Sequence, residues 1–251
     1  MHDREYGSRA IIGVAVPQAN PTVEPEMTAL LPSGVNLVTT RLTSLCPSPK
    51  DRLYEYESDF YKAQEAFDTL KPDALGFACT GASYLVGSQE EDQKTADISK
   101  KLGYPVITAA QAIREALRRL KAKRIALLSP YPDWLTDAGL AYWGNQGFEV
   151  VQTELISLPS SDTRGVYAIR NAAVLETGKK FLGSGADVLL MSGTGMPTLR
   201  AIQPLQQELG IPVISSNYCL AWAMFDAIGI LPSRHDEASL LSGYEDKLSD
   251  L

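Results

Sequence analysis

Two stretches of the chain carry residue types that could do chemistry, and the two are built alike. They are PDALGFACTGASYLVG at residues 72–87 and ADVLLMSGTGMPTLRA at residues 186–201. Each holds an Asp, an apolar run, a small turn with Thr-Gly and a helix-like start. The sixth residue after the Asp is Cys79 in the first stretch and Gly193 in the second. A thiol therefore stands at only one of two equivalent positions.

Cys79 is open to two interpretations from its position alone. It follows an apolar strand and precedes a helix-like segment, and the unpaired N–H groups of a helix N-terminus favour a thiolate. It could equally be a small buried hydrophobe at the end of a strand. For Cys46, in the loop-like SLCPSPK, and for Cys219, in an apolar helix, we favour a structural role.

Other polar or small residues at strand ends are candidates for binding a substrate. Asn20 could hold a carboxylate, or it could cap the helix that begins at Pro21. Tyr131 could donate its hydroxyl into a cleft or cover the sheet edge. Thr80 and Thr194 occupy matching positions, where each could bind an oxygen pair or act as an N-cap. The glycines beside these threonines complete the candidate set, namely Gly81, Gly193 and Gly195.

The elements that must position these residues alternate along the chain. Short β-rich apolar segments bounded by Gly, Pro or polar residues predict strands at residues 10–17, 34–42, 73–79, 104–109, 124–130, 148–156, 187–192 and 211–216. Longer amphipathic segments predict helices at residues 51–70, 89–102, 110–121, 133–146, 165–183, 197–209 and 217–229. The alternation predicts an α/β fold with parallel sheets and helices on both faces.

The likeness of the two opening stretches extends along the chain. KKLGYPVITAAQAIREAL resembles QELGIPVISSNYCLAWAM, and IIGVAVPQAN resembles RIALLSPYPD. We therefore predict two similar parallel-sheet halves related by a pseudo-two-fold axis, over residues 1–121 and over residues 122–251 with a polar C-terminal tail. Ligands of open α/β sheets bind beyond the carboxyl ends of the strands. We expect the active site between the halves, with positions 79 and 193 on opposite sides of the ligand.

Composition and charge exclude several classes of function. The 251 residues carry a net charge of -7, which gives no long-range attraction to nucleic acid or to an anionic membrane. No apolar run approaches the roughly 20 residues of a membrane span, and the N-terminus lacks a signal-peptide pattern, so we expect a cytoplasmic protein. Three sparse cysteines, with His2 and His235 near the chain ends, argue against a disulfide framework, a zinc site or a His-based triad. No nucleotide-binding motif follows a strand, and we expect neither cofactor nor metal.

Taken together, the motifs resemble the aspartate/glutamate racemase superfamily, in its maleate cis-trans isomerase and arylmalonate decarboxylase branch. The resemblance covers most of residues 9–230 and rests on VPQANPTVEPEM, ACTGASYLVG, LLSPYPDW, MSGTGMPTLRAI and GIPVISSNYCLAW. It implies two α/β halves with the active site between them, which agrees with the repeat. It also implies cofactor-independent chemistry at the carbon next to a carboxylate, and hence a small carboxylate as substrate. The family habit further implies a homo-oligomer.

The chain departs from the pattern of this superfamily in its cysteines. The resemblance implies one cysteine per half, as opposed acid and base, in racemases, and both cysteines in maleate isomerases. Arylmalonate decarboxylases keep only the second-half cysteine, whereas this chain has the reverse, with Cys79 and Gly193. The chain therefore lacks the second thiol that two-base racemisation would need. One thiol suffices to protonate the enediolate left by loss of CO2, from the face opposite to that used by the known arylmalonate enzymes. One thiol also suffices to add to an activated alkene.

From the sequence we predict a Cys79-dependent enzyme acting on a small dicarboxylate, with decarboxylation of a 2-substituted malonate slightly ahead of maleate-type cis-trans isomerisation. The negative charge that develops on a carboxylate would be stabilised by Thr80, Tyr131, Thr194 and the backbone of 193–195. Two alternatives remain, a racemase with a second base that is not cysteine and a non-catalytic protein that binds a carboxylate.

Overall fold

Two four-stranded parallel sheets organise the chain, and the computed structural model describes residues 4–158, 161–231 and Leu240. The first sheet has the strand order β2-β1-β3-β4, with strands Ala10–Pro17 (β1), Val35–Leu42 (β2), Ala74–Phe77 (β3) and Val106–Thr108 (β4). The second has the order β6-β5-β7-β8, with strands Arg124–Ser129 (β5), Glu149–Leu155 (β6), Val188–Met191 (β7) and Val213–Ser215 (β8). All eight predicted strands and the predicted fold class are confirmed.

The repeat in the sequence is a repeat in the hydrogen bonding. Asp73 donates its backbone N–H to Ile11 O, and its carboxylate accepts the N–H of Ile11 at 2.8 Å. Asp187 donates to Arg124 O in the same way, and its carboxylate accepts the N–H of Arg124 at 2.8 Å. Each Asp therefore fixes the start of its strand against the neighbouring central strand, β1 or β5. The two stretches that opened the sequence analysis are structurally equivalent.

Helices fill the connections, and two of those predicted are broken. The region 51–70 holds Pro49–Ser58 (α2), Phe60–Ala63 (α3) and the 3-10 helix Gln64–Phe67 (η1). The region 165–183 holds the 3-10 helix Thr163–Ala168 (η2), Asn171–Gly178 (α8) and the 3-10 helix Lys179–Phe181 (η3). The first break follows from packing, since Phe60 turns inward against Phe77 with ring centroids 4.6 Å apart.

Five of the remaining helices agree with the predicted ranges, and two short ones follow Pro21 and Cys79, where helix starts were expected without a range. The predicted ones are Ser88–Leu102 (α5), Ala109–Arg119 (α6), Asp133–Asn145 (α7), Leu199–Leu209 (α9) and Ser216–Ala227 (α10). Val23–Ala29 (α1) and Thr80–Val86 (α4) span only seven residues each, which is too short for a clear periodic pattern. No helix among the described residues is both long and apolar enough to cross a membrane.

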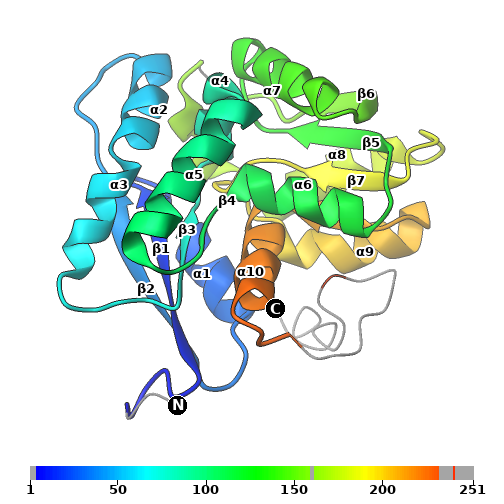
Figure 1. Ribbon diagram of the computed structural model, residues 1–251. Coiled ribbons are helices and arrows are strands. Elements are labelled where there is room, and N and C mark those ends of the chain that lie inside the picture. The colour runs from blue at the N-terminus through cyan, green and yellow to red at the C-terminus, as the bar shows by residue number, and fades with distance from the viewer. Residues whose placement is uncertain (1–3, 159–160, 232–239, 241–251) are drawn as a thin grey trace.

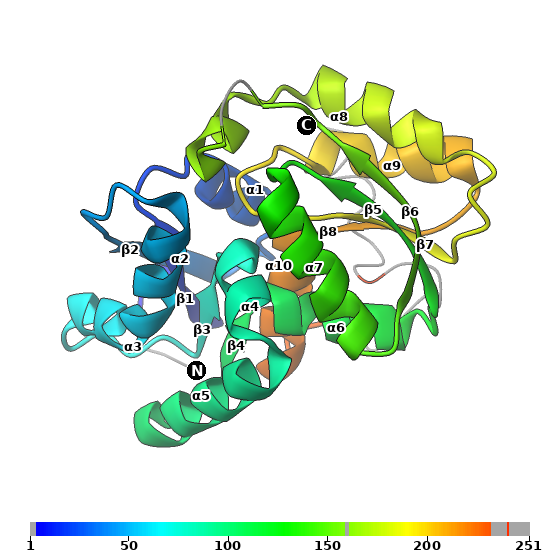
Figure 2. The ribbon, with the colours of Figure 1, turned by 90° about the horizontal axis from the view of Figure 1, so that it is seen from above.

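The division into two halves along the chain is not complete in space, because helices pack across it. Figures 1 and 2 show α4, α6 and α10 lying between the two sheets, with α8 and α9 covering the outer face of the second. Although α10 follows the last strand of the second sheet, it packs against β3, β4 and α6. In β3, a Cβ on Gly76 would come within 2.8 Å of Met224 Sδ on α10. The polar tail and both histidines lie outside the described residues, apart from Leu240.

A buried carboxylate ties the first half to the second. Glu26 on α1 is 8% exposed, and it accepts the backbone N–H of Leu199 at 2.9 Å and Nδ2 of Asn217 at 2.7 Å. It also accepts the N–H of Thr198, the N-cap of α9, where negative charge is favoured by the helix dipole. Burial raises the pKa of Glu26, and these hydrogen bonds oppose that rise.

We expect Glu26→Ala to lower the free energy of unfolding by about 3 kcal/mol or more, because it leaves several buried donors without an acceptor. Urea unfolding followed by circular dichroism measures this loss. The matched control is Glu24→Ala on the same helix, whose partner Arg41 has a 44% exposed side chain. This control should change stability by about 1 kcal/mol or less. Equal losses from the two variants would contradict the role given to Glu26.

Candidate active site

Cys79 and Gly193 follow equivalent strands at equivalent distances. Ala78 donates its backbone N–H to Ala15 O at 3.0 Å, and Ser192 donates to Leu128 O at 2.9 Å, so each residue extends its strand in the same register. The next residue is Cys79 in one half and Gly193 in the other. Cys79 is the N-cap of α4, as the sequence pattern indicated.

A small cavity brings most of the predicted site residues together. Its lining comprises Pro17, Asn20, Arg52, Leu53, Tyr56, Cys79, Gly81, Tyr131, Thr163, Arg164, Val166, Tyr167, Thr194 and Gly195. Six of the eight residues predicted from the sequence are among them, and they come from both halves. Thr80 and Gly193 are absent from the lining. The cavity volume of about 30 Å³ leaves room for roughly two water molecules.

The thiol of Cys79 is protonated at neutral pH. Its residue is 5% exposed, and burial raises its pKa to about 12, against smaller opposing effects of the Ala82 N–H and the Arg52 charge. In this state the group is a proton donor. To act as a nucleophile it must release its proton as it attacks.

The hydroxyls of the two matching threonines hold the halves together. Thr194 Oγ1 donates to the carbonyl oxygen of Ala78 at 2.7 Å, across the seam between the halves. Thr80 Oγ1 donates to Ser216 Oγ at 3.0 Å, and the same oxygen accepts the backbone N–H of Gly193 at 2.9 Å. These donors are therefore engaged within the protein, whereas the sequence pattern predicted that they face the ligand.

Asn20 and Tyr131 line the cavity from the two halves. Asn20 is 2% exposed; its Oδ1 accepts the N–H of Thr22 at 2.9 Å, and its Nδ2 lies 3.4 Å from Thr194 Oγ1. The N-cap of α1 is Thr22, so Asn20 shapes the turn before the helix rather than capping it. Burial raises the pKa of Tyr131 well above its ordinary value, which keeps its hydroxyl a neutral donor.

Position 193 has no space for a second thiol. The φ of Gly193 is +111°, a backbone conformation that favours glycine. A Cβ placed there would lie 2.8 Å from Pro130 Cγ and 3.3 Å from the hydroxyl oxygen of Tyr131. Tyr131 therefore occupies the space that a side chain at position 193 would need.

Two arginines share one carboxylate at the cavity, and none of these three residues was predicted from the sequence. Arg52 on α2 has a side chain only 2% exposed, and its Nη2 lies 2.6 Å from Asp162 Oδ1. Arg164 on η2 donates to the other oxygen of Asp162, with Nε at 3.0 Å. These contacts lower the pKa of Asp162 to about 2. One carboxylate against two guanidinium groups leaves a net positive charge beside Cys79.

No sequence signal marked these charges. Arg52 falls in a predicted helix where a charged residue is normally solvated, and the segment from Asp162 to Arg164 has no strand-end position. The aromatic side chains of Tyr56 and Tyr167, which also line the cavity, were missed for the same reason. Within the described residues, no three His, Cys, Asp or Glu side chains gather as metal ligands would.

Two alike α/β halves, with a cysteine at a strand end where they meet, are the arrangement that the resemblance to the aspartate/glutamate racemase superfamily implied. The profile of the arylmalonate decarboxylase family matches residues 12–241, and the chain belongs to that family. The resemblance inferred from the motifs is thereby confirmed.

Curated relatives include enzymes with two different activities. A maleate isomerase from Geobacillus stearothermophilus is 29% identical over 245 residues, which cover 92% of this chain and 97% of that protein. An arylmalonate decarboxylase from Bordetella bronchiseptica is 24% identical over 221 residues, covering 87% and 90% of the two chains. The chain is therefore an isomerase or a decarboxylase that uses cysteine chemistry.

Solved structures agree with the fold. A cysteine-to-serine mutant of Nocardia farcinica maleate cis-trans isomerase, with a covalently bound succinylcysteine intermediate, aligns with a TM-score of 0.78 at 25% identity, covering 88% of this chain and 94% of that one. An arylmalonate decarboxylase structure aligns with a TM-score of 0.75 at 21% identity, covering 92% and 98%. The second likeness concerns the fold alone.

Gly193→Ala should destabilise the protein by about 2–4 kcal/mol, because backbone strain and the contact with Pro130 add together. Thermal and urea unfolding measure the loss. Gly103→Ala is the matched control, since Gly103 has a φ of +79° but no atom within 4 Å of an added Cβ. It should cost about 1–2 kcal/mol from strain alone. A Gly193 variant no less stable than the control would show that position 193 has room for a side chain.

The reactivity of Cys79 should follow its raised pKa. Only the thiolate is alkylated, so the rate of modification by iodoacetamide should rise about tenfold per pH unit from about pH 8 to 11 without reaching a plateau. Peptide mass spectrometry resolves Cys79 from Cys46 and Cys219, and circular dichroism verifies that the fold persists at each pH. A plateau near pH 9 would mean that the thiol is not desolvated as described.

Proposed function

We propose that the protein is a cysteine-dependent cis-trans isomerase of a small alkene dicarboxylate of the maleate type. The observation that carries the proposal is Arg52, buried in the same cavity as Cys79 and linked to a carboxylate. A buried guanidinium is suited to bind a second carboxylate in two parallel hydrogen bonds. Curated maleate isomerases that are 29% and 28% identical to the chain support the same substrate class.

The substrate is expected to exchange with Asp162. The cavity is too small for a dicarboxylate while Asp162 occupies Arg52. One carboxylate of the substrate takes the place of Asp162 on Arg52, and this replaces one charge-assisted contact by another. The second carboxylate lies towards Asn20 and the neutral hydroxyl of Tyr131. Asp162 keeps its contact with Arg164 throughout.

The reaction needs only one thiol. The sulfur of Cys79 forms a bond to one alkene carbon, and the thiol proton passes to the other carbon, so that the double bond becomes a single bond. The two ends rotate about this bond. Reversal breaks the carbon–sulfur bond and returns a proton to sulfur, leaving the trans alkene. The protonated resting state of Cys79 suits this sequence, because the thiol supplies both the nucleophile and the proton.

Decarboxylation, which the sequence analysis placed slightly ahead, is the second candidate. The family match supports it, and a protonated Cys79 is the acid that an enediolate would require. Arg52 weighs against it where it binds the carboxylate that departs, whereas on the retained carboxylate it would stabilise the enediolate. A cation that binds the departing carboxylate stabilises the ground state more than the transition state, in which that charge is lost, and so slows the loss of CO2. In isomerisation both carboxylates persist, and Arg52 can hold one throughout.

Proton NMR in D2O separates these reactions when the protein is mixed with maleate, methylmalonate, phenylmalonate, aspartate or glutamate. We expect fumarate from maleate, with loss of this activity in Cys79→Ala. Monodeuterated acids from the malonates, without fumarate, would instead establish decarboxylation. Deuterium entering aspartate or glutamate would indicate racemisation. A shift in melting temperature without turnover, unchanged in Cys79→Ala, would indicate a binding protein.

Arg52 is tested separately from Cys79. Arg52→Gln should raise KM for the dicarboxylate about 10–100-fold with a smaller change in kcat, because it removes a charge-assisted contact made to substrate and transition state alike. Arg52→Lys, which keeps the charge but not the planar fork, should lie between. Melting temperatures show whether loss of the link to Asp162 has unfolded either variant. An unchanged KM in Arg52→Gln would remove Arg52 from the substrate site.

A further inference from the structure

A second cavity lies in the first half, apart from the Cys79 site. Its volume is about 250 Å³, and no residue that lines it also lines the Cys79 cavity. It lies over the ends of β3 and β4, between α2–α3 on one side and α4–α5 on the other. A cavity of about 150 Å³ is enough to bind benzene, so this one has space for a ring and a short side chain.

The body of the cavity is apolar. Phe60 and Phe77 are 4% and 1% exposed, and both line it, together with Val86 and Ile98. Aromatic and branched side chains of this kind take up a small hydrocarbon group or an aromatic ring.

One end of the cavity is polar and holds a hydroxyl without a hydrogen bond. Ser83 is 2% exposed, and its Oγ has no hydrogen-bond partner. It lies near the carboxyl of Glu91, close enough to lower the pKa of Glu91 but without hydrogen-bond geometry. Thr95 and Thr108 line the same cavity and add two more hydroxyls. A buried hydroxyl left without a partner is costly, and a bound polar group would relieve that cost.

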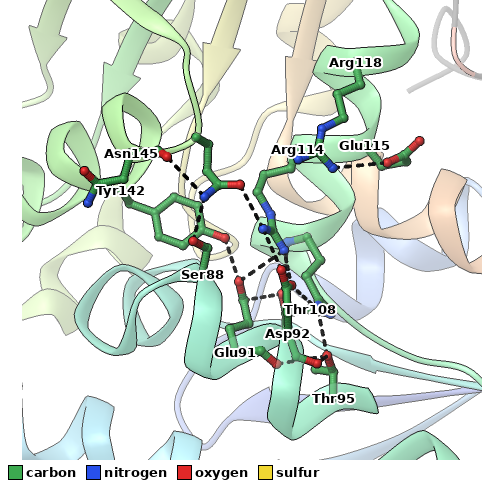
Figure 3. Close-up of polar contacts among 12 residues, drawn as sticks. Ser88, Glu91, Asp92, Thr95, Thr108, Arg114, Glu115, Arg118, Tyr142 and Asn145 are labelled. Carbon is green, nitrogen blue, oxygen red and sulfur yellow. Dashed lines mark hydrogen bonds and ion pairs between the residues drawn. The ribbon is translucent and has the colours of Figure 1, made fainter.

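Neighbouring polar side chains hold the carboxyl of Glu91 in place, as Figure 3 shows. Its Oε1 accepts the hydroxyl of Thr108, and its Oε2 accepts the hydroxyl of Tyr142 at 2.6 Å. Arg114 lies 3.8 Å from the carboxylate and is itself bound to Asp92. Burial raises the pKa of Glu91. Each carboxylate oxygen has a second lone pair, so Glu91 can accept from a ligand without giving up these partners.

The charges that line the cavity select against anions. Three carboxyl groups line it, on Glu57, Glu91 and Asp97, against the single ammonium of Lys94. Lys94 is already paired, with Glu57 at 2.7 Å and with Glu90 at 2.8 Å. A carboxylate or phosphate would therefore meet repulsion, whereas a cation would be attracted to Glu91.

We propose that this cavity is a binding site for a small primary amine with an apolar body. The ammonium group has three donors, which match the carboxylate of Glu91 and the hydroxyls of Ser83 and Thr95. The body lies against the packed rings of Phe60 and Phe77. This site is independent of the reaction assigned to Cys79. It is adjacent to it, since Phe77 precedes Cys79 by two residues and Ser83 lies on α4, which begins directly after Cys79.

Isothermal titration calorimetry on the full chain tests the site with three probes that share a ring and a two-carbon arm or its nearest equivalent: 2-phenylethylamine, 2-phenylethanol and phenylacetate. We expect saturable binding of the amine, about tenfold or more weaker binding of the alcohol, and no binding of the carboxylate. Absence of amine binding, or equal binding of all three probes, would overturn the proposal.

Variants place the binding in this cavity. Ile98→Trp fills the cavity and should abolish binding of 2-phenylethylamine, whereas Ile98→Ala, the matched control at the same position, should retain it. Glu91→Gln should weaken binding about tenfold or more, because it removes the charge that attracts the ammonium group. Its melting temperature is measured as a control for folding, since Glu91 also accepts the hydroxyl of Tyr142. Cys79→Ala should bind the amine normally. Binding that survives Ile98→Trp or is lost in Cys79→Ala would place the amine elsewhere.

Discussion

The arrangement of the site depends on a few hydrogen bonds that cross from one half to the other at the ends of the central strands. Thr194 donates to the carbonyl of Ala78, and Thr80 shares the hydroxyl of Ser216 with the N–H of Gly193. These contacts are buried and connect residues next to Cys79, so they fix the distance between Cys79 and the opposite wall. A hydrogen bond in a desolvated seam is stronger than one in water, and leaving its partner unpaired costs more.

Within that seam, a symmetric backbone carries asymmetric chemistry. Asp73 and Asp187 fix their strands identically, yet the residues that follow have diverged. In the first half, the buried thiol of Cys79 stays protonated. In the second half, Gly193 has a positive φ, and the hydroxyl of Tyr131 lies where its side chain would be. Charge is distributed unevenly too, because Arg52 is contributed by the first half and is bound by Asp162 of the second. The duplicated fold provides two equivalent positions and the side chains give them different roles.

The strands and the halves could be predicted because local pattern determines them. Each strand is an apolar run ended by Gly, Pro or a polar residue, and the repeat of the two opening stretches places Cys79 opposite Gly193. The break within 51–70 could not be predicted, since it follows from the packing of Phe60 against the distant Phe77. The buried positions of Arg52, Glu26 and Glu91 could not be predicted for a related reason. The residue type does not show whether a charged side chain on a helix is buried or solvated, because this depends on tertiary contacts.

The position of α10 affects how the protein is synthesised and folded. This helix is made last among the described elements, yet it covers β3 and β4 of the sheet that is made first. During synthesis, the apolar face around Gly76 stays exposed to water until Leu220 and Met224 have been made and α10 covers it. The core of the first half is therefore incomplete until α10 has been made. The two halves therefore share one hydrophobic core, and the Cys79 cavity, which is lined by residues of both halves, needs the second half to be present.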